Sequence, residues 1–174
     1  SGLDLFISDS LIKTLPDPQD VIHIPTCLSG ISVVYNLPGV QSLQLNAEVL
    51  SLIFQNKITV WSDSRIQEIN PDVILPNDDI VVIYRDKGSG SSYIMTQYLT
   101  MMDESWKDSI NVTMSPEIPN GVKAPTSKQV AKLIKQVKGS IGYVGLSYAN
   151  DINLSKASIQ NKQGEYIFPT IDSI

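Results

Sequence analysis

The segment 80–102 constrains the fold of this chain more than any other. It opens with an apolar, β-branched run from Ile80 to Tyr84, which predicts a buried strand. The glycine- and serine-containing segment Arg85–Ser91 interrupts this run, and apolar side chains then recur at helical spacing to about Met102. A strand that leads through a short turn into a helix is the repeating unit of α/β folds with a mainly parallel sheet.

The turn of this unit carries groups that bind small anions. The first amides of a helix have no partner inside the helix, and the helix dipole favours negative charge beside them. Gly90 allows close approach of the backbone, while Ser89 and Ser91 add hydroxyl groups. Arg85 offers two parallel donors to an oxyanion. A purely structural interpretation fits the same turn, because serine is also a favoured helix cap. The spacing matches neither the P-loop nor the dinucleotide-binding fingerprint.

Elsewhere in the chain, segments with the residue pattern of strands alternate with segments that have apolar residues at helical spacing, which supports the α/β interpretation. Asn46 and Thr126 stand where helix N-caps are expected, and Gln129 occupies the capping-box position. The predicted strands are 3–7, 21–25, 31–37, 112–114 and 141–144; the predicted helices are 45–54, 63–69, 90–102 and 126–139; a hairpin is predicted over 157–168, and 116–125 is predicted to be a loop.

Composition excludes several classes of function. A formal net charge of −5 argues against nucleic acid, which requires a basic surface. No apolar run approaches the length of about 18 residues that predicts a membrane span. Cys27 and His23 are the only residues of their types, so neither a transition-metal site nor a catalytic pair with histidine is predicted. We expect no metal, no cofactor and no enzymatic activity.

Six segments follow one another in an order that is typical of one protein family. Three of them read Leu3-Asp-Leu-Phe-Ile-Ser-Asp9, Val33-Val-Tyr-Asn-Leu-Pro-Gly39 and Arg85-Asp-Lys-Gly-Ser-Gly-Ser-Ser92. The other three are residues 50–61, 66–76 and 139–149. Together they resemble the periplasmic phosphate-binding proteins, the solute receptors of phosphate ABC transporters, over nearly the whole chain.

This resemblance implies a periplasmic-binding-protein-like α/β fold (type II), with a mostly parallel sheet flanked by helices. It implies a single phosphate-binding-protein-like domain over residues 1–174. Within it, residues of about 35–149 would form the second lobe, whereas about 1–34 and 150–174 would form the hinge and the edge of the first lobe. The N-terminal and C-terminal parts of the family's first lobe have no counterpart in this sequence.

The resemblance also assigns phosphate-binding roles. Arg85 would hold two phosphate oxygens, and the hydroxyls of Ser89 and Ser91 would donate to the anion. The amides of Gly90 and Ser91 would complete that side. Asp9 would accept a hydrogen bond from a protonated phosphate oxygen, which fully ionised sulfate lacks; a helix cap is the structural alternative for Asp9.

Lys87 is the departure from the family within this turn. The family has an aspartate two residues after the arginine, where it braces the guanidinium. A lysine there either adds positive charge to the cleft or points to solvent, as most lysines do.

The expected function is therefore non-catalytic binding of inorganic phosphate in a periplasmic or extracellular setting, with an ABC permease as a further partner. The alternative is a degenerate, binding-protein-like module for extracellular interaction or sensing, which contacts a protein partner and no longer binds phosphate. An enzyme ranks third, because the paired carboxylates Asp78–Asp79 and Asp103–Glu104 point apart on regular elements.

Overall fold

The structure is a computed structural model that describes residues 12–17, 21–22, 24 and 29–173. The predicted strands 3–7 and 21–25, together with Asp9, His23 and Cys27, therefore lie wholly or partly outside the described residues. The strands are β1 (Ile31–Tyr35), β2 (Gln44–Leu45), β3 (Val81–Arg85), β4 (Val122–Ala124), β5 (Ser140–Gly145), β6 (Ser155–Lys156), β7 (Ser158–Gln160) and β8 (Tyr166–Ile167). The helices are α2 (Ala47–Phe54), α3 (Ser64–Glu68), α4 (Gly90–Met102), α5 (Glu104–Ser109), α6 (Ser127–Gln136) and α7 (Leu146–Asp151), followed by the 3₁₀ turn η2 (Ile171–Ser173).

The central sheet has five strands in the order β4-β3-β5-β1-β6, and β2, β7 and β8 form a small second sheet. The pairs β3–β4 and β3–β5 are parallel, as the strand–turn–helix pattern predicts. The pairs β1–β5 and β1–β6 are antiparallel, so the sheet is mixed and the expectation of a mostly parallel sheet is wrong. The reason is topological. The chain enters along β1 and returns beside it along β5, where the Leu146 amide donates to the Gly30 carbonyl (2.9 Å).

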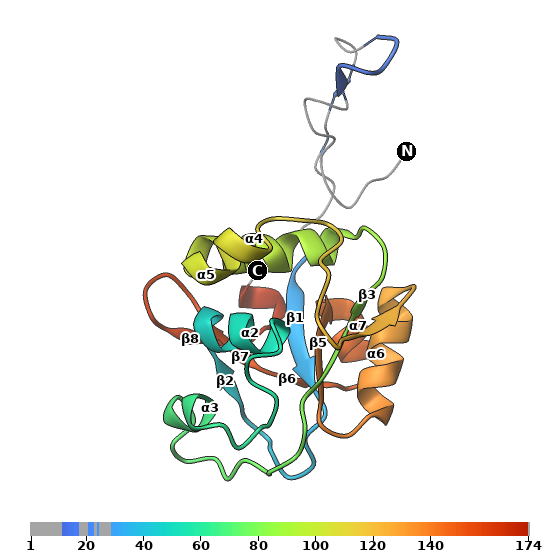
Figure 1. The fold of residues 1–174 in the computed structure, drawn as a ribbon. Helices are drawn as coiled ribbons and strands as arrows, with labels where there is room; N and C mark the ends of the chain where they lie inside the picture. Colours follow the sequence, from blue (N-terminus) through green and yellow to red (C-terminus); the bar gives the residue numbers. More distant parts are fainter. Residues whose placement is uncertain (1–11, 18–20, 23, 25–28, 174) are drawn as a thin grey trace.

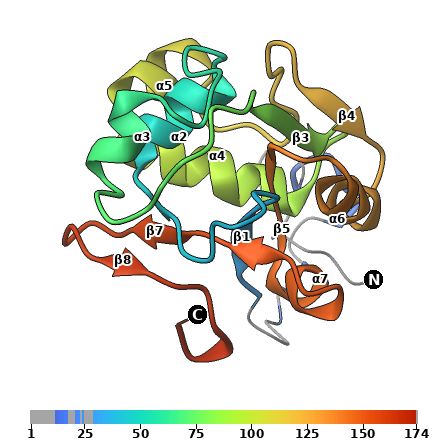
Figure 2. The same cartoon turned by 90° about the horizontal axis from the view of Figure 1, so that it is seen from below.

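Helices cover both faces of the central sheet (Figures 1 and 2). Successive side chains of a strand point to opposite faces, so each central strand contributes side chains to two separate cores. In β3, for example, Val82 and Tyr84 join the core beneath α2, α4 and α5, whereas Ile83 joins the core beneath α6 and α7. The result is a three-layer α/β/α domain, and the predicted α/β class is confirmed.

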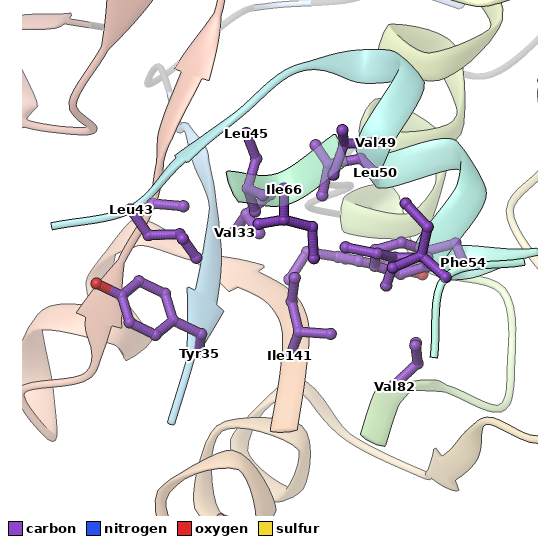
Figure 3. Packing of buried hydrophobic residues seen from close by; sticks show 14 of the residues in the cluster. Val33, Tyr35, Leu43, Leu45, Val49, Leu50, Phe54, Ile66, Val82 and Ile141 are labelled. Carbon is purple, nitrogen blue, oxygen red and sulfur yellow. The ribbon is translucent and has the colours of Figure 1, made fainter. Parts of the chain in front are cut away.

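The larger of the two cores is built from aliphatic and aromatic side chains of distant segments. Figure 3 shows side chains from α2 and its flanking chain directed towards side chains of β1, β3 and β5. Phe54 of α2 lies against the Tyr143 ring of β5, with ring centroids 5.8 Å apart. This packing fixes β5 relative to the helices on the larger core's face of the sheet.

Helix starts follow the cap residues that the sequence predicts. Asn46 caps α2 by accepting from the Val49 amide (2.9 Å), and Thr126 caps α6 by accepting from the Gln129 amide (3.2 Å). Asp63 caps α3 in the same way, through the Arg65 amide. Local sequence therefore determines where these helices begin.

Two predictions around the long connection after α5 are wrong. Residues 112–114 form no strand, because the Thr96 hydroxyl of α4 occupies both backbone groups of Thr113. It donates to the Thr113 carbonyl (2.8 Å) and accepts from the Thr113 amide (3.0 Å). The backbone groups that a strand partner would need are thus already engaged. Conversely, β4 lies inside the segment predicted as a loop, where it pairs with β3 at the edge of the sheet. The hairpin of β7 and β8 is confirmed.

No helix in the described ranges combines the length and the apolar character that a membrane crossing requires. The division of the chain into a second lobe (35–149) and flanking first-lobe segments stays a prediction.

Candidate functional site

The predicted anion-binding turn lies at the carboxyl end of the parallel strands. β3 ends at Arg85 and leads through a turn into α4, as Figure 1 shows. Its parallel neighbour β4 ends at Ala124, opposite Arg85, and leads into α6. The two helices pack on opposite faces of the sheet, so both N-termini lie at this edge. Ligands of open α/β sheets bind outside the carboxyl ends of the strands, which is where this turn lies.

Ser89 forms the start of α4. Its backbone is extended (φ −145°, ψ 150°), and its side chain accepts a hydrogen bond from the Ser92 amide at 3.1 Å. The Ser89 amide donates to the Met114 carbonyl (3.1 Å), which holds the turn against the connection after α5. The amides of Gly90 and Ser91 donate to no acceptor among the described residues. Two backbone donors at the positive end of a 13-residue helix are therefore free for a ligand.

A cluster of hydroxyl groups extends from this turn into the core. Ser89 Oγ lies 3.2 Å from Ser91 Oγ, and it donates to Ser92 Oγ at 3.0 Å. Ser92 Oγ in turn lies 2.9 Å from the hydroxyl of Tyr143. Burial raises the pKa of the Tyr143 phenol to about 12, although the Ser92 hydrogen bond and the Arg85 charge act in the opposite direction. Tyr143 therefore remains a protonated, neutral group.

Arg85 lies between the two helix starts. Its Nη1 atom donates to Ser127 Oγ at the first position of α6 (3.3 Å). Its Nε atom is buried and has no hydrogen-bond partner in the described part of the chain, and the same is true of Asp86 Oδ1. A buried donor without a partner costs about 1–3 kcal/mol, and more when the group is charged. An anion at this turn would remove that cost.

Single unpartnered polar atoms also occur elsewhere in the described residues, at Ser32, Thr100 and Trp106, and Asp78 Oδ2 has no hydrogen bond but forms an ion pair with Lys138 (3.0 Å). None of these comes with an unpaired cationic donor and two unpaired helix amides. The combination distinguishes the turn from an ordinary packing defect.

The remaining predicted site residues have different outcomes. Lys87 is exposed and forms no ion pair with any described carboxylate, which fits the solvent-pointing alternative. Asp9 lies outside the described residues, so its predicted role as an acceptor stays a prediction.

Sequence reasoning missed Ser92, Ser127 and Tyr143. Ser92 could have been found, because it stands three residues after the cap and supplies the amide that a cap serine binds. Ser127 and Tyr143 come from distant segments, and no local pattern links them to the turn.

Residues 7–173 match the PBP superfamily domain. The chain belongs to the PBP superfamily. The phosphate-binding protein PstS of Pasteurella multocida is 34% identical over 174 residues, and the match covers 98% of this chain and 51% of that protein. The PstS protein of Haemophilus influenzae is 33% identical, with coverages of 98% and 52%. The predicted resemblance to periplasmic phosphate-binding proteins is thus confirmed.

Solved structures agree on the fold. A high affinity periplasmic phosphate-binding protein, PfluDING, solved with bound phosphate, superimposes with a TM-score of 0.72 at 19% identity. The superposition covers 96% of this chain and 48% of that one. The chain therefore spans about half the length of the relatives that it matches.

Proposed function

We propose that this domain binds inorganic phosphate, without chemical change, at the turn between β3 and α4. The observation that supports this most directly is the set of unpaired donors at the turn: buried Arg85 Nε and the free amides of Gly90 and Ser91. Donors of this kind satisfy a tetrahedral oxyanion, and each bond to a charged group contributes about 1.5–3 kcal/mol. The names of the PstS relatives agree with this ligand.

In the proposed complex, Arg85 binds two phosphate oxygens, and Ser89 and Ser91 donate their hydroxyl protons. Asp9 accepts from the protonated oxygen of HPO₄²⁻, which gives selectivity against sulfate, because a carboxylate repels an anion that has no proton to donate. Lys87 acts from the solvent side through its charge alone. In this proposal the Asp9 carboxylate selects phosphate over sulfate, and the Lys87 charge attracts the anion.

The same proposal places the domain in a periplasmic or extracellular setting, where it would deliver phosphate to an ABC permease. The alternative, an interaction or sensing module that no longer binds phosphate, is less well supported. In a domain without a ligand, the unpaired guanidinium donor of Arg85 would lower stability with no gain in binding.

The proposal is tested by isothermal titration calorimetry of the 174-residue chain with phosphate and then with sulfate. We expect saturable heat with phosphate only. Arg85→Ala should weaken binding by at least about a hundredfold, since two charge-assisted hydrogen bonds are lost. Arg65→Ala is the matched control, because Arg65 is a surface arginine paired with Asp63 (2.7 Å), remote from the turn.

Wild-type affinity in Arg65→Ala would show that the loss is specific to the turn. Absence of phosphate heat in the wild-type chain, or equal affinity in Arg85→Ala, would overturn the proposal.

A further inference from the structure

A line of three hydroxyl groups connects the proposed phosphate site to the core of the domain. Tyr143 of β5 is 2% exposed, Ser92 of α4 is 0% exposed, and Ser89 at the turn is 9% exposed. The oxygen atoms are 2.9 Å apart from Tyr143 to Ser92 and 3.0 Å apart from Ser92 to Ser89. Both distances are those of good hydrogen bonds, so the three groups form one continuous chain.

Each hydroxyl has a single proton, so a continuous chain in which each group donates to the next runs in one of two directions. In the first, Ser89 donates to Ser92, as in the structure, and Ser92 donates to Tyr143. The phenol proton then has no acceptor among the described residues, although the phenol is buried. An unsatisfied buried donor costs about 1–3 kcal/mol.

The opposite direction satisfies every proton. Tyr143 donates to Ser92, and Ser92 donates to Ser89. Ser89 Oγ also accepts from the Ser92 amide (3.1 Å), so both of its lone pairs are then occupied. Its own proton is then directed towards the turn, where Ser91 Oγ lies 3.2 Å away. A phosphate oxygen at the turn would take this proton in place of the Ser91 hydroxyl, because hydrogen bonds to a charged acceptor are shorter and stronger than bonds between neutral groups.

We propose that Tyr143 and Ser92 are positioning residues for phosphate: they orient the hydroxyl of Ser89 so that it donates to the anion, and binding reverses the direction of the chain. This inference rests on the proposed function. It makes the buried phenol a determinant of affinity although it lies behind the site. Hydrogen bonds in a chain polarise one another, so loss of the phenol weakens the terminal bond as well.

The phenol is suited to this part because it stays protonated. Burial raises its pKa to about 12, even though Arg85 lowers it. Tyr143 is thus a fixed donor over the pH range in which H₂PO₄⁻ and HPO₄²⁻ are the main forms of phosphate.

The test is a set of titrations with inorganic phosphate on the 174-residue chain. Tyr143→Phe removes the first donor and keeps the ring against Phe54, while Ser92→Ala removes the middle hydroxyl. Each should weaken phosphate binding about five- to tenfold, the value of one hydrogen bond with its cooperative part. The double variant Ser92→Ala/Tyr143→Phe should lose no more than either single variant, since breaking the chain once is sufficient.

Two comparisons separate positioning from general destabilisation. Tyr35→Phe is the matched control, because Tyr35 is 1% exposed and its hydroxyl donates to the Val40 carbonyl away from the turn. It should leave phosphate affinity unchanged. In a Ser89→Ala background, Tyr143→Phe should change affinity less than twofold, because the terminal hydroxyl through which it acts is gone.

The outcomes are distinct. If the wild-type chain binds phosphate but Tyr143→Phe has wild-type affinity, or if its effect persists undiminished without the Ser89 hydroxyl, the positioning role is overturned and the proposed function stands. If the wild-type chain binds no phosphate, the proposed function is overturned together with this inference. A five- to tenfold loss that depends on Ser89 and is absent in Tyr35→Phe supports the inference.

Discussion

Two polar regions of the domain differ in how their hydrogen-bonding groups are used. Around Asn70, which is 3% exposed, every side-chain group is paired: Oδ1 accepts from the Gln44 amide (2.8 Å), and Nδ2 donates to the carbonyls of Gln44 and Ile66 (both 2.9 Å). At the turn, Arg85 Nε and the amides of Gly90 and Ser91 are unpaired.

The contrast shows what each region contributes. A buried polar group whose bonds are all made holds two elements in register, as Asn70 does for β2 and α3. A group whose bonds are not made lowers stability but keeps its binding capacity for a ligand. The comparison therefore predicts that substitutions will separate stability from binding according to region.

The largest expected effect contrasts a glycine of the central sheet with a glycine of the turn. Gly142→Ala in β5 would place a Cβ atom 2.3 Å from the Ile83 carbonyl oxygen and 2.8 Å from Ile134 Cδ1. We expect it to lower the free energy of unfolding by about 3 kcal/mol or more, measured by urea denaturation. At the turn, a Cβ on Gly88 would meet its nearest atom, Ser115 Oγ, at 3.5 Å, so Gly88→Ala should change stability by less than about 0.5 kcal/mol. Equal losses would mean that the turn is packed as tightly as the sheet.

The next effect compares the two polar side chains directly. Asn70→Ala leaves the backbone groups of Gln44 and Ile66 without their partner and should cost about 2–4 kcal/mol of unfolding free energy. Arg85→Ala removes the unpaired Nε donor together with the long bond from Nη1 to Ser127 Oγ (3.3 Å), and should cost less than about 1 kcal/mol, chiefly from packing of its aliphatic stem. Denaturant unfolding of both variants measures the difference. A reversed order of the two costs would contradict the distinction between the regions.

The smallest effect concerns helix caps. Ser89→Ala and Asn46→Ala each remove a cap hydrogen bond, at the starts of α4 and α2, and each should lower stability by about 1 kcal/mol. Only Ser89→Ala should also weaken phosphate binding, because Asn46 is a cap without a ligand role. Thermal unfolding combined with phosphate titration checks both parts. An equal loss of affinity in Asn46→Ala would show that helix stability, and not the Ser89 hydroxyl, controls binding.

The local parts of this fold were predictable because they depend on neighbouring residues. The caps at Asn46 and Thr126, the helix after the turn and the hairpin near Gly164 follow from periodicity and cap chemistry alone. The turn that we propose as the anion site was predictable for the same reason, since Arg85 and Ser89 are close in sequence.

Features that depend on distant segments were not predictable. The mixed sheet arises because β1 and β5, more than a hundred residues apart in the chain, run side by side in opposite directions. Likewise, Tyr143 and Ser127 reach the turn only through sheet pairing and helix packing. The strand expected at 112–114 is absent because Thr96, on another element, binds the backbone there first. In each case tertiary contacts override local propensity.

The antiparallel pairing of β1 with β5 also determines how the domain responds to mechanical force. Gly30 and Leu146 lie at the same end of this pair, next to the Ile31–Gly145 step of its register. A load applied between these two points acts on one rung of hydrogen bonds at a time, because the bonds lie across the strands and along the pull. A load applied between Ile31 and Ile141, which lie at opposite ends of the same pair, would instead pull along the strands and shear the rungs together. The β1–β5 seam therefore resists a pull along its strands much more than a pull across its Gly30–Leu146 end.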